Sequence, residues 1–492
     1  MTLNHADEVV GVRPRAEMHT EAFIGGRWTA SSDGSVITVL DPATELVLAE
    51  VADCGVEDAL RGVDAAAGAL PAWGRRPPRE RGEILRRAYE LMIEREDELA
   101  ELIVAENGKA YSDALSEVRY AAEFFRWYGE EAVRLVGSVQ TAPAGTNRIL
   151  VLPQPIGVAL LITPWNFPAA MATRKIGPAL AAGCTVLLKP ASETPLTALA
   201  VGALLADAGV PDGVVNVLPS RRSGAVAEAV LHDPRVRKLS FTGSTEVGRR
   251  LLAVAADQVV SCSMELGGNA PFVVLEDADL DDAVAGAMVA KMRNGGEACT
   301  AANRIYVHAA VADAFGRLLA GAMDALRVGP GRDRESQVGP LVNAAARQKV
   351  RELVDGAVAD GARVLTTGRV PVGPGFYYPP TVLVDVAAGS AILREEIFGP
   401  VAPLVTFTSD EEAVRLANDS EFGLVSYLYT RDLARGLRMS EALDSGMVGI
   451  NRGVVSDPAA PFGGTKQSGL GREGGHEGLL AFVEQKYVAV GW

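Results

Sequence analysis

Residues 185–218 read TVLLKPASETPLTALAVGALLADAGVPDGVVNVL. Two short apolar runs in this stretch, Thr185–Lys189 and Val214–Leu218, have the length and composition typical of buried strands. Between them, Pro195–Ala208 is rich in alanine and leucine and has proline in its first turn, which predicts a helix. A strand, a helix and a second strand joined by short loops indicate a β-α-β unit with parallel strands.

The same alternation continues on both sides of this unit. The further strands and helices that the pattern predicts are Asn147–Pro153, Ile156–Ile162, Gly224–Leu231, Val236–Phe241, Ser244–Ala256 and Val259–Glu265. The first, second, fourth and sixth of these segments are β-like, and the other two are helical. The series predicts an α/β fold with a doubly wound parallel sheet, which is the usual architecture of a dinucleotide-binding domain.

A second α/β series follows. It is predicted to contain helices at Ala278–Met292, Ala310–Leu326, Ala344–Asp360 and Ala434–Glu441, and strands at Arg304–Val307, Arg363–Thr366, Val401–Phe407 and Val425–Thr430. We therefore expect a second α/β domain, near whose start Cys299 lies. A cleft between two such domains is where a ligand held by one would meet a reactive group from the other.

The N-terminal part of the chain has a different pattern. Residues 1–18 resemble a loose polar arm, and the run from Phe23 to Trp28 predicts a hairpin that turns at Gly25-Gly26. Val56–Leu135 is helical in pattern, and Gly108 is placed to end one of its helices as a C-cap.

Composition narrows the possible functions. The chain has 492 residues and a net charge of −15, which argues against nucleic acid or an anionic membrane as its main partner. Its four cysteines are isolated and its five histidines show no ligand spacing, so we expect no metal site. No apolar stretch is long enough for a membrane span, and no signal peptide is evident, so a cytoplasmic location is expected.

Cys299 is the first candidate catalytic residue. It lies in the glycine-containing stretch Asn294–Thr300, which allows another molecule to approach the sulfur closely. Glu265 ends a predicted strand and precedes two glycines. A thiol and a carboxylate of this kind suggest covalent catalysis with a general base. Considered alone, an isolated cysteine is more often a small buried apolar residue, and a glutamate of this kind a strand-end charge.

Other polar residues fit the same chemistry. Attack by a thiolate on a carbonyl carbon produces an oxyanion, and Asn166, set between aromatic residues and prolines, could donate a hydrogen bond to it. Gly243 and Ser244 join a strand to a helix, whose N-terminus could meet a pyrophosphate. Lys189 ends a strand at the edge where ligands bind in such sheets. Each of these residues also has an ordinary structural interpretation, as a turn former, a helix cap or a surface charge.

Seven segments together resemble the aldehyde dehydrogenase superfamily, in its order and rough spacing, from about residue 20 to the end. They are PWNFP (164–168), KPAS (189–192), FTGSTEVG (241–248), ELGGN (265–269), GEACT (296–300), EEIFGPV (395–401) and PFGGTKQSGLGREG (461–474). The resemblance implies a Rossmann-type cofactor domain, an α/β catalytic domain and a small β oligomerisation element.

The resemblance also implies domain boundaries and an assembly. The dinucleotide-binding domain would comprise residues 1–135 and 155–262, and the catalytic domain residues 263–477. Residues 136–154 and 478–492 would be oligomerisation segments, as in the homodimers and homotetramers of the family.

The roles of family residues transfer to the matching positions. Cys299 is the implied nucleophile and Glu265 the general base, while Asn166 and the Cys299 backbone N–H form the oxyanion hole. Lys175 and Glu473 match polar positions that assist near the site. The positions that fall where the family binds NAD or NADP are Trp165, Lys189, Ser192, Gly243, Ser244, Glu396 and Phe398.

Within the superfamily, the chain looks most like succinate-semialdehyde dehydrogenases. In that subfamily the positions matching Arg174, Arg293 and Ser456 hold the distal carboxylate of the substrate, a role that suits arginine. Two positions depart from the family pattern. Glu297 replaces a common glutamine, and this extra carboxylate could raise the pKa of the thiol or bind a cation. Ala301 replaces a second cysteine that forms a regulatory disulfide in some members.

The sequence is compatible with more than one substrate and with either cofactor. The same chemistry would serve glutarate semialdehyde or a general aliphatic or aromatic aldehyde, and a coenzyme-A-acylating or non-catalytic member is a further alternative. Many NAD-preferring relatives have glutamate where this chain has Ser192. The neutral serine would leave Lys189 free to pair with a 2′-phosphate, so we expect NADP to be accepted.

Overall fold

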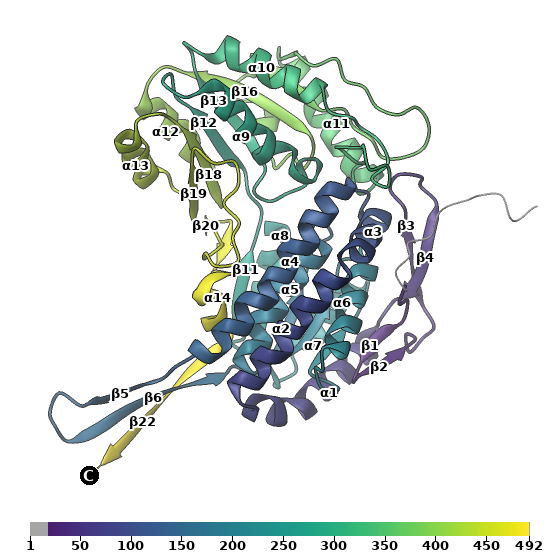
Figure 1. The fold of residues 1–492 in the computed structure, drawn as a ribbon, viewed down its shortest axis with the longest axis vertical. Helices are drawn as coiled ribbons and strands as arrows, with labels where there is room; N and C mark the ends of the chain where they lie inside the picture. The colour runs from purple at the N-terminus through teal and green to yellow at the C-terminus, as the bar shows by residue number, and fades with distance from the viewer. Residues whose placement is uncertain (1–17, 492) are drawn as a thin grey trace, which may run out of the picture.

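In the computed structural model, which describes residues 18–491, two large sheets lie one above the other and a third, small sheet extends from the body (Figure 1). The first large sheet has five parallel strands at its centre. Their order in the sheet is β9 (Val215–Val217), β8 (Thr185–Lys189), β7 (Val158–Ile162), β10 (Val236–Thr242) and β11 (Ser261–Glu265). All five lie within a residue or two of the segments predicted from the sequence.

Antiparallel strands extend this sheet at both edges. The hairpin of β1 (Ala22–Ile24) and β2 (Arg27–Thr29) adds to β9, and β21 (Gly469–Leu470) adds to β11. The hairpin confirms the turn expected at Gly25-Gly26, where both residues have positive φ.

The order of the strands indicates where a ligand would bind, at the ends of β7 and β10. The chain runs from β7 outward through β8 to β9 and then returns to β10 and β11 on the other side. This change of direction is the topological switch point of a doubly wound, Rossmann-type sheet, where ligands bind beyond the carboxyl ends of the strands. Helices α6 (Pro195–Asp207), α7 (Ser223–Leu231) and α8 (Thr245–Ala256) connect these strands, as predicted.

The second large sheet is also mainly parallel. Its strand order is β14 (Arg363–Val364), β15 (Thr381–Val384), β16 (Val401–Phe407), β13 (Ala302–His308), β12 (Ala270–Val274), β18 (Val425–Tyr429) and β19 (Met447–Ile450). The helices of this unit are α9 (Leu280–Met292), α10 (Ala312–Asp324), α11 (Ala344–Ala359), α12 (Asp410–Asn418) and α13 (Leu433–Ala442). The fold is therefore α/β in both units.

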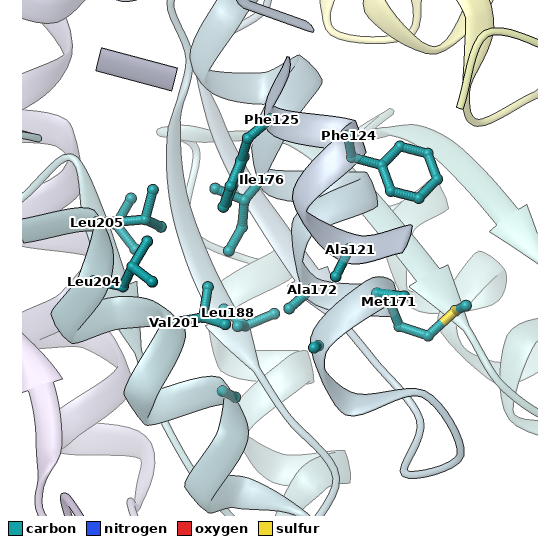
Figure 2. Packing of buried hydrophobic residues seen from close by; sticks show 14 of the residues in the cluster. Ala121, Phe124, Phe125, Met171, Ala172, Ile176, Leu188, Val201, Leu204 and Leu205 are labelled. Carbon is teal, nitrogen blue, oxygen red and sulfur yellow. The ribbon is translucent and has the colours of Figure 1, made fainter. Parts of the chain in front are cut away.

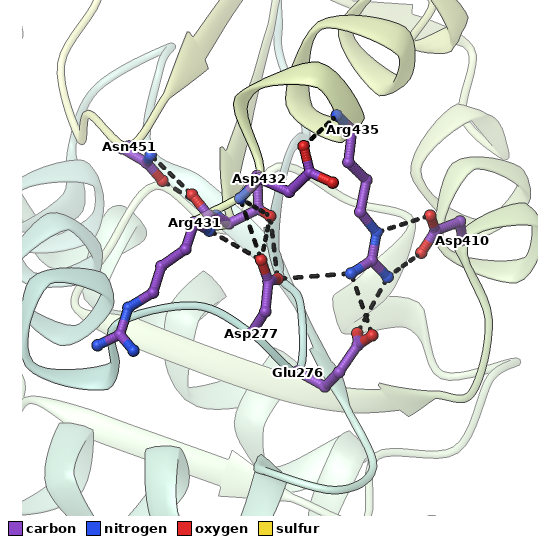
Figure 3. Close-up of polar contacts among 8 residues, drawn as sticks. Glu276, Asp277, Asp410, Arg431, Asp432, Arg435 and Asn451 are labelled. Carbon is purple, nitrogen blue, oxygen red and sulfur yellow. Dashed lines mark hydrogen bonds and ion pairs between the residues drawn. The ribbon is translucent and has the colours of Figure 1, made fainter.

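An ionic cluster joins the elements at one side of the second unit (Figure 3). Arg435 on α13 binds Asp410 of α12 and Glu276 of the segment after β12, with Nε–Oδ2 and Nη2–Oε2 distances of 2.8 and 3.0 Å. Asp277 accepts hydrogen bonds from the backbone of the α13 entry segment. The carboxylates around Arg435 raise its pKa, so this guanidinium keeps its charge and holds α12 and α13 against the sheet.

The N-terminal part of the chain contains the helices α1 (Val56–Arg75), α2 (Pro78–Glu94), α3 (Glu96–Asn107) and α4 (Tyr111–Glu131), and Gly108 caps α3 with a φ of 88° as predicted. Helices α2, α3 and α4 lie on one face of the first sheet, whereas α1 packs on the opposite face, against α7 and β8. A further helix, α5 (Pro168–Ala182), was not predicted. Every residue of α5 is buried, beneath α4 and beside α6 (Figure 2).

The small sheet has three antiparallel strands, β22 (Val483–Gly491), β6 (Asn147–Pro155) and β5 (Ser138–Thr141). It extends away from the body and brings the two predicted oligomerisation segments together (Figure 1). Several of its apolar side chains are exposed, among them Val139, Leu152 and Tyr487.

Several further elements were also not predicted. They are strands β12, β15 and β19 of the second sheet, the hairpin β3 (Val36–Leu40) and β4 (Val47–Ala52), the two-stranded pair β17 (Phe422–Gly423) and β20 (Thr465–Lys466), and helix α14 (Gly475–Leu480). Residues 1–17 of the expected polar arm, and residue 492, lie outside the described residues. None of the helices between residues 18 and 491 combines the length and apolar character of a membrane span.

The crossing of α2 and α4 gives a test of this packing. A Cβ on Gly82 would lie 2.5 Å from the carbonyl oxygen of Gly129, so Gly82→Ala should force the two helices apart. We expect it to lower the free energy of unfolding by about 1–3 kcal/mol, measured by denaturant titration with circular dichroism. Gly68→Ala in α1, where a Cβ meets nothing within 4 Å, is the matched control and should be neutral or stabilising. Equal effects of the two variants would contradict the packing.

Candidate active site

A cavity of about 410 Å³ lies where the two α/β units meet. The first unit contributes the loop after β7 and the start of α8, and the second contributes Cys299, the start of α11 and the segment before β16. Its lining residues include Trp165, Asn166, Met171, Thr242, Gly243, Ser244, Leu266, Gly267, Cys299, Val342, Asn343, Lys349, Glu396 and Phe398. Seven of the residues predicted from the sequence thus line one cavity.

The loop that carries Cys299 has an unusual backbone. Asn294, Gly295 and Gly296 have φ values of 55°, 61° and 82°, a left-handed conformation that only glycine adopts without strain. At Gly296 a side chain would also collide with the backbone of Gly399. The two glycines therefore let the chain turn sharply after α9 and bring Cys299 to the cavity wall.

Hydrogen bonds hold this loop against the loop that carries Asn166. The Asn166 amide Nδ2 donates to the carbonyl oxygen of Glu297 at 3.0 Å. Asn294 Nδ2 donates to the carbonyl oxygens of both Asn166 and Glu297, each at 2.9 Å. Behind Cys299, the hydroxyl of Tyr427 donates to the Thr300 carbonyl at 3.0 Å. Asn166 Nδ2 carries two protons, so one remains for an oxyanion in the cavity.

A buried ion pair fixes the Asn166 loop from the other side. Lys109 Nζ lies 2.6 Å from Glu117 Oε2 and donates to the carbonyl oxygen of Asn166 at 2.7 Å. Glu117 also accepts from the backbone N–H groups of Ala169 and Ala170 at the start of α5. The side chains of Lys109 and Glu117 are 2% and 0% exposed, so the pair ties the loop to the start of α5 out of contact with solvent.

Glu297 does not act on the thiol as the sequence suggested. Its Oε1 accepts from the backbone N–H of Val342 at 3.1 Å, and burial raises its pKa to about 8. Near neutral pH this carboxyl is therefore mostly uncharged. Among the described residues, no group of three or more His, Cys, Asp or Glu side chains is arranged to hold a metal ion, so a cation at Glu297 would lack such a set of ligands.

The surrounding protein determines the state of the thiol. Burial raises the pKa of Cys299 to about 12, and the carboxylates of Glu396 and Glu265 act in the same direction. Arg174 and Arg293 oppose this by placing positive charge nearby. The resting cysteine is therefore a neutral thiol, and a base has to remove its proton before it can attack.

Glu265 belongs to a buried cluster of charges beside the cavity. Burial and the neighbouring Glu473 raise the pKa of Glu265 well above its ordinary value. Its Oε2 has no hydrogen-bond partner among the described side chains. Lys175 donates to Glu473 and, at 2.9 Å, to Ser240. The cluster thus contains Glu265, which has one oxygen without a hydrogen-bond partner, beside the paired Lys175 and Glu473.

Arg174 is committed to this cluster. Its Nε lies 2.6 Å from Glu473 Oε2, and its guanidinium lies over the ring of Phe462 at 4.3 Å. The side chain is 1% exposed and is not part of the cavity lining. Arg174 was predicted to bind a substrate carboxylate, but in this structure its charge is already paired inside the protein.

The other two residues predicted to bind substrate are more accessible. Arg293 is partly exposed, with its guanidinium 4.9 Å from the centre of the Phe167 ring and 5.8 Å from that of Tyr120. Ser456 is partly buried in the segment after β19. In contrast to Arg174, neither is bound to a carboxylate in the described contacts.

The cavity has the groups needed to hold a dinucleotide. Helix α8 begins at its edge, capped by Ser244, whose Oγ accepts from the Val247 N–H at 3.4 Å, and a helix N-terminus favours a phosphate. The buried hydroxyl oxygen of Thr242 lines the cavity and has no hydrogen-bond partner among the described residues. Trp165 and Phe398 meet edge to face, with ring centres 5.3 Å apart, and so form an aromatic wall.

Glu396 and Lys349 stand at the other end of the cavity. Glu396 Oε1 accepts from the backbone N–H of Gly268 at 3.3 Å, and burial raises its pKa to about 7. Lys349 Nζ donates to the Glu396 carbonyl at 2.7 Å. Lys349, Thr242 and Lys109 were not predicted from the sequence. The spacing of Ala345, Ala346 and Lys349 along α11 would have indicated a common helix face.

The last predicted cofactor residues lie outside this cavity. Lys189 ends β8 and donates from Nζ to the Pro190 carbonyl at 3.1 Å. The hydroxyl of Ser192 donates to Glu193 Oε2 at 3.2 Å. Both residues lie on the same edge of the sheet as the cavity, one strand beyond β7.

The chain is similar to known proteins over nearly its whole length. Residues 28–488 match the aldehyde dehydrogenase family. The chain belongs to this family. A succinate-semialdehyde dehydrogenase of Paenarthrobacter nicotinovorans is 54% identical over 445 residues, 90% of this chain and 99% of the relative. A glutarate-semialdehyde dehydrogenase of Pseudomonas putida is 48% identical, covering 96% and 97% of the two chains.

Solved structures confirm the fold. An NADP-dependent enzyme of Escherichia coli superposes with a TM-score of 0.95 at 47% identity, covering 96% of this chain and 98% of that one. The protein is thus an aldehyde dehydrogenase that uses NAD or NADP, as the sequence predicted. The helix start, the unpaired Thr242 hydroxyl and the aromatic wall fit such a cofactor.

The Lys109–Glu117 pair yields a test of how the site is positioned. Lys109→Met leaves a buried carboxylate unpaired and should lower the free energy of unfolding by about 3–5 kcal/mol. The double variant Lys109→Met/Glu117→Gln should recover most of that stability. Its kcat should nevertheless stay at least about tenfold below the wild type, because the Asn166 loop has lost its lysine contact.

Denaturation curves and steady-state kinetics on the two variants and on Glu117→Gln measure these effects. If the double variant recovers both stability and kcat, the pair stabilises the fold without positioning Asn166.

Proposed function

We propose that this enzyme oxidises succinate semialdehyde to succinate. The observation that carries the proposal is the position of Arg293. It lies six residues before Cys299 in the chain, beside the aromatic rings of Phe167 and Tyr120, and acts on the thiol electrostatically. A short aldehyde with a distal carboxylate would reach from the sulfur to this guanidinium. The named activities of the similar proteins support the same substrate class.

The proposed reaction begins at Cys299. Its sulfur attacks the aldehyde carbon as the proton leaves toward Glu265, and a thiohemiacetal oxyanion forms. The second proton of Asn166 Nδ2 and the backbone N–H of Cys299 would donate to this oxygen. Loss of a hydride from this carbon, for which a bound nicotinamide would be the acceptor, would leave a thioester on Cys299. Trp165, Glu396 and Phe398 would orient the nicotinamide end of the cofactor, and Gly243 and Ser244 its pyrophosphate.

Hydrolysis completes the proposed cycle. Glu265 would first pass the thiol proton out through the cluster of Lys175 and Glu473, which lies against it, and so become ionised again. It would then take a proton from water, whose oxygen attacks the thioester and releases the acid, and it would return this proton to the departing thiolate of Cys299. Because burial and Glu473 both raise the pKa of Glu265, we expect the hydrolytic step to slow as the pH falls through that pKa.

Arg174 and Ser456 would act at the far end of the substrate. Arg174 adds positive charge near Cys299 while its side chain stays paired with Glu473, so we assign the direct carboxylate contact to Arg293. Ser456 would donate its hydroxyl to the same carboxylate.

We also propose that the dinucleotide-binding domain comprises residues 1–135 and 155–262 and the catalytic domain residues 263–477. We further propose that the protein forms a homodimer or homotetramer through residues 136–154 and 478–492. The exposed apolar residues on the extending sheet of β5, β6 and β22 support it. A reducing compartment such as the cytoplasm is proposed because all four cysteines are unpaired and the mechanism needs a free thiol.

The carboxylate contact is tested with Arg293→Ala. For succinate semialdehyde, KM should rise at least about tenfold, because a charge-assisted contact is lost. For butanal, which lacks the carboxylate, KM should change little. Arg317→Ala, which removes an exposed arginine of α10, is the control for net charge. Equal effects of Arg293→Ala on both aldehydes would refute the contact.

The same assay separates the alternatives. A lower KM for glutarate semialdehyde than for succinate semialdehyde would favour the longer substrate. Formation of a coenzyme-A thioester instead of the free acid would identify an acylating enzyme. Activity that persists in Cys299→Ser would exclude the thiol mechanism.

A further inference from the structure

The turn between β8 and α6, residues 189–195, contains an acidic group that the proposed cofactor site does not explain. Ser192 is followed by Glu193, and the Ser192 hydroxyl donates to Glu193 Oε2 at 3.2 Å. Both side chains are partly exposed. The hydroxyl of Ser192 therefore points to a carboxylate that belongs to the next residue, and the local site is acidic although residue 192 is neutral.

This turn lies where the adenosine half of a dinucleotide would be. Lys189 pairs with Ile162 across β8 and β7, so the turn and the Trp165 loop leave the sheet at the same edge. The cavity that contains Cys299 lies at the switch point between β7 and β10. A dinucleotide whose nicotinamide end is beside Cys299 would extend outward along that edge, over β7 and toward the end of β8.

Lys189 is less available than a surface lysine would be. Its side chain is buried, one of its protons goes to the Pro190 carbonyl at 3.1 Å, and burial lowers its pKa to about 8. The carboxylates of Glu193 and Asp53 oppose this decrease in the pKa of Lys189, and Glu193 has the larger effect. Lys189 thus already has a negative partner in Glu193. A 2′-phosphate would have to compete with this carboxylate for the lysine.

We propose that Glu193 makes the enzyme favour NAD over NADP. A carboxylate at this place accepts a hydrogen bond from the 2′-hydroxyl of an adenosine ribose and repels a 2′-phosphate. NADP still binds, because Lys189 remains beside it, but it binds more weakly than NAD. This inference rests on the proposed function, since it takes Lys189 and Ser192 as the ribose site.

Glu193→Gln tests the inference by binding rather than by turnover. Isothermal titration with NAD, NADP, 5′-AMP and 2′,5′-ADP would give four Kd values for each protein. The variant should bind NADP and 2′,5′-ADP about five- to tenfold more tightly than the wild type, and NAD and 5′-AMP equally or more weakly. Raising the ionic strength should reduce the difference between the two proteins, because the effect is electrostatic and the turn is exposed.

Glu441→Gln is the matched control, because it removes one exposed carboxylate from α13 in the other α/β unit. Its Kd values should equal those of the wild type. If Glu193→Gln leaves the ratio of the NADP and NAD Kd values unchanged, or if the wild type already binds NADP more tightly, the inference is overturned. If neither dinucleotide binds any of the three proteins, the proposed cofactor site itself fails.

Discussion

The hydrogen bond from the Asn166 amide to the Glu297 carbonyl joins the two halves of the active site. Asn166 belongs to the loop after β7 in the first sheet unit, and Glu297 belongs to the loop between α9 and β13 in the second. It is 3.0 Å long and holds the Asn166 amide against Glu297, two residues before Cys299 in the chain. Because Lys109 holds one loop and the glycines at 295 and 296 shape the other, the distance between thiol and amide depends on this contact.

The ionisable groups of the site form two sets. Burial raises the pKa values of Cys299, Glu265, Glu297 and Glu396, because an ionised group loses its hydration there. Lys175 and Arg174 are also buried, and both pair with the carboxylate of Glu473. The positive charges of this second set oppose the rise in the pKa of Glu265 and so help it to ionise.

Much of this fold could be predicted from the sequence because most strands of the first sheet are short apolar runs bounded by helices with a polar face. Helix α5 could not. All of its residues are buried, so it has no polar face and no periodicity of 3.6 residues to detect. The hairpin of β3 and β4, near the N-terminus, was also not predicted.

The site was predictable to a similar extent. Short motifs located Cys299, Glu265 and Asn166, because glycines and prolines near them indicate where the backbone must turn. The pairing of Arg174 with Glu473 joins residues 299 positions apart, 473 minus 174, and no local pattern indicates such a contact. For the same reason the sequence suggested that Arg174 was free to bind substrate. Lys109 and Lys349 were missed because the backbone carbonyls to which they donate, those of Asn166 and Glu396, lie 57 and 47 residues away in the chain.

In the proposed mechanism the sulfur of Cys299 carries the acyl group of the substrate, and trapping this acyl-enzyme would show it. The wild-type enzyme would be mixed with NAD and succinate semialdehyde, quenched in acid within the first turnover, digested and examined by mass spectrometry, with Cys299→Ser as the control. A succinyl group is expected on the wild-type peptide that contains Cys299 and on no peptide of the control. Release of NADH in a first turnover with no acyl group on Cys299, or an acyl group on Cys54, Cys184 or Cys262 instead, would contradict this mechanism.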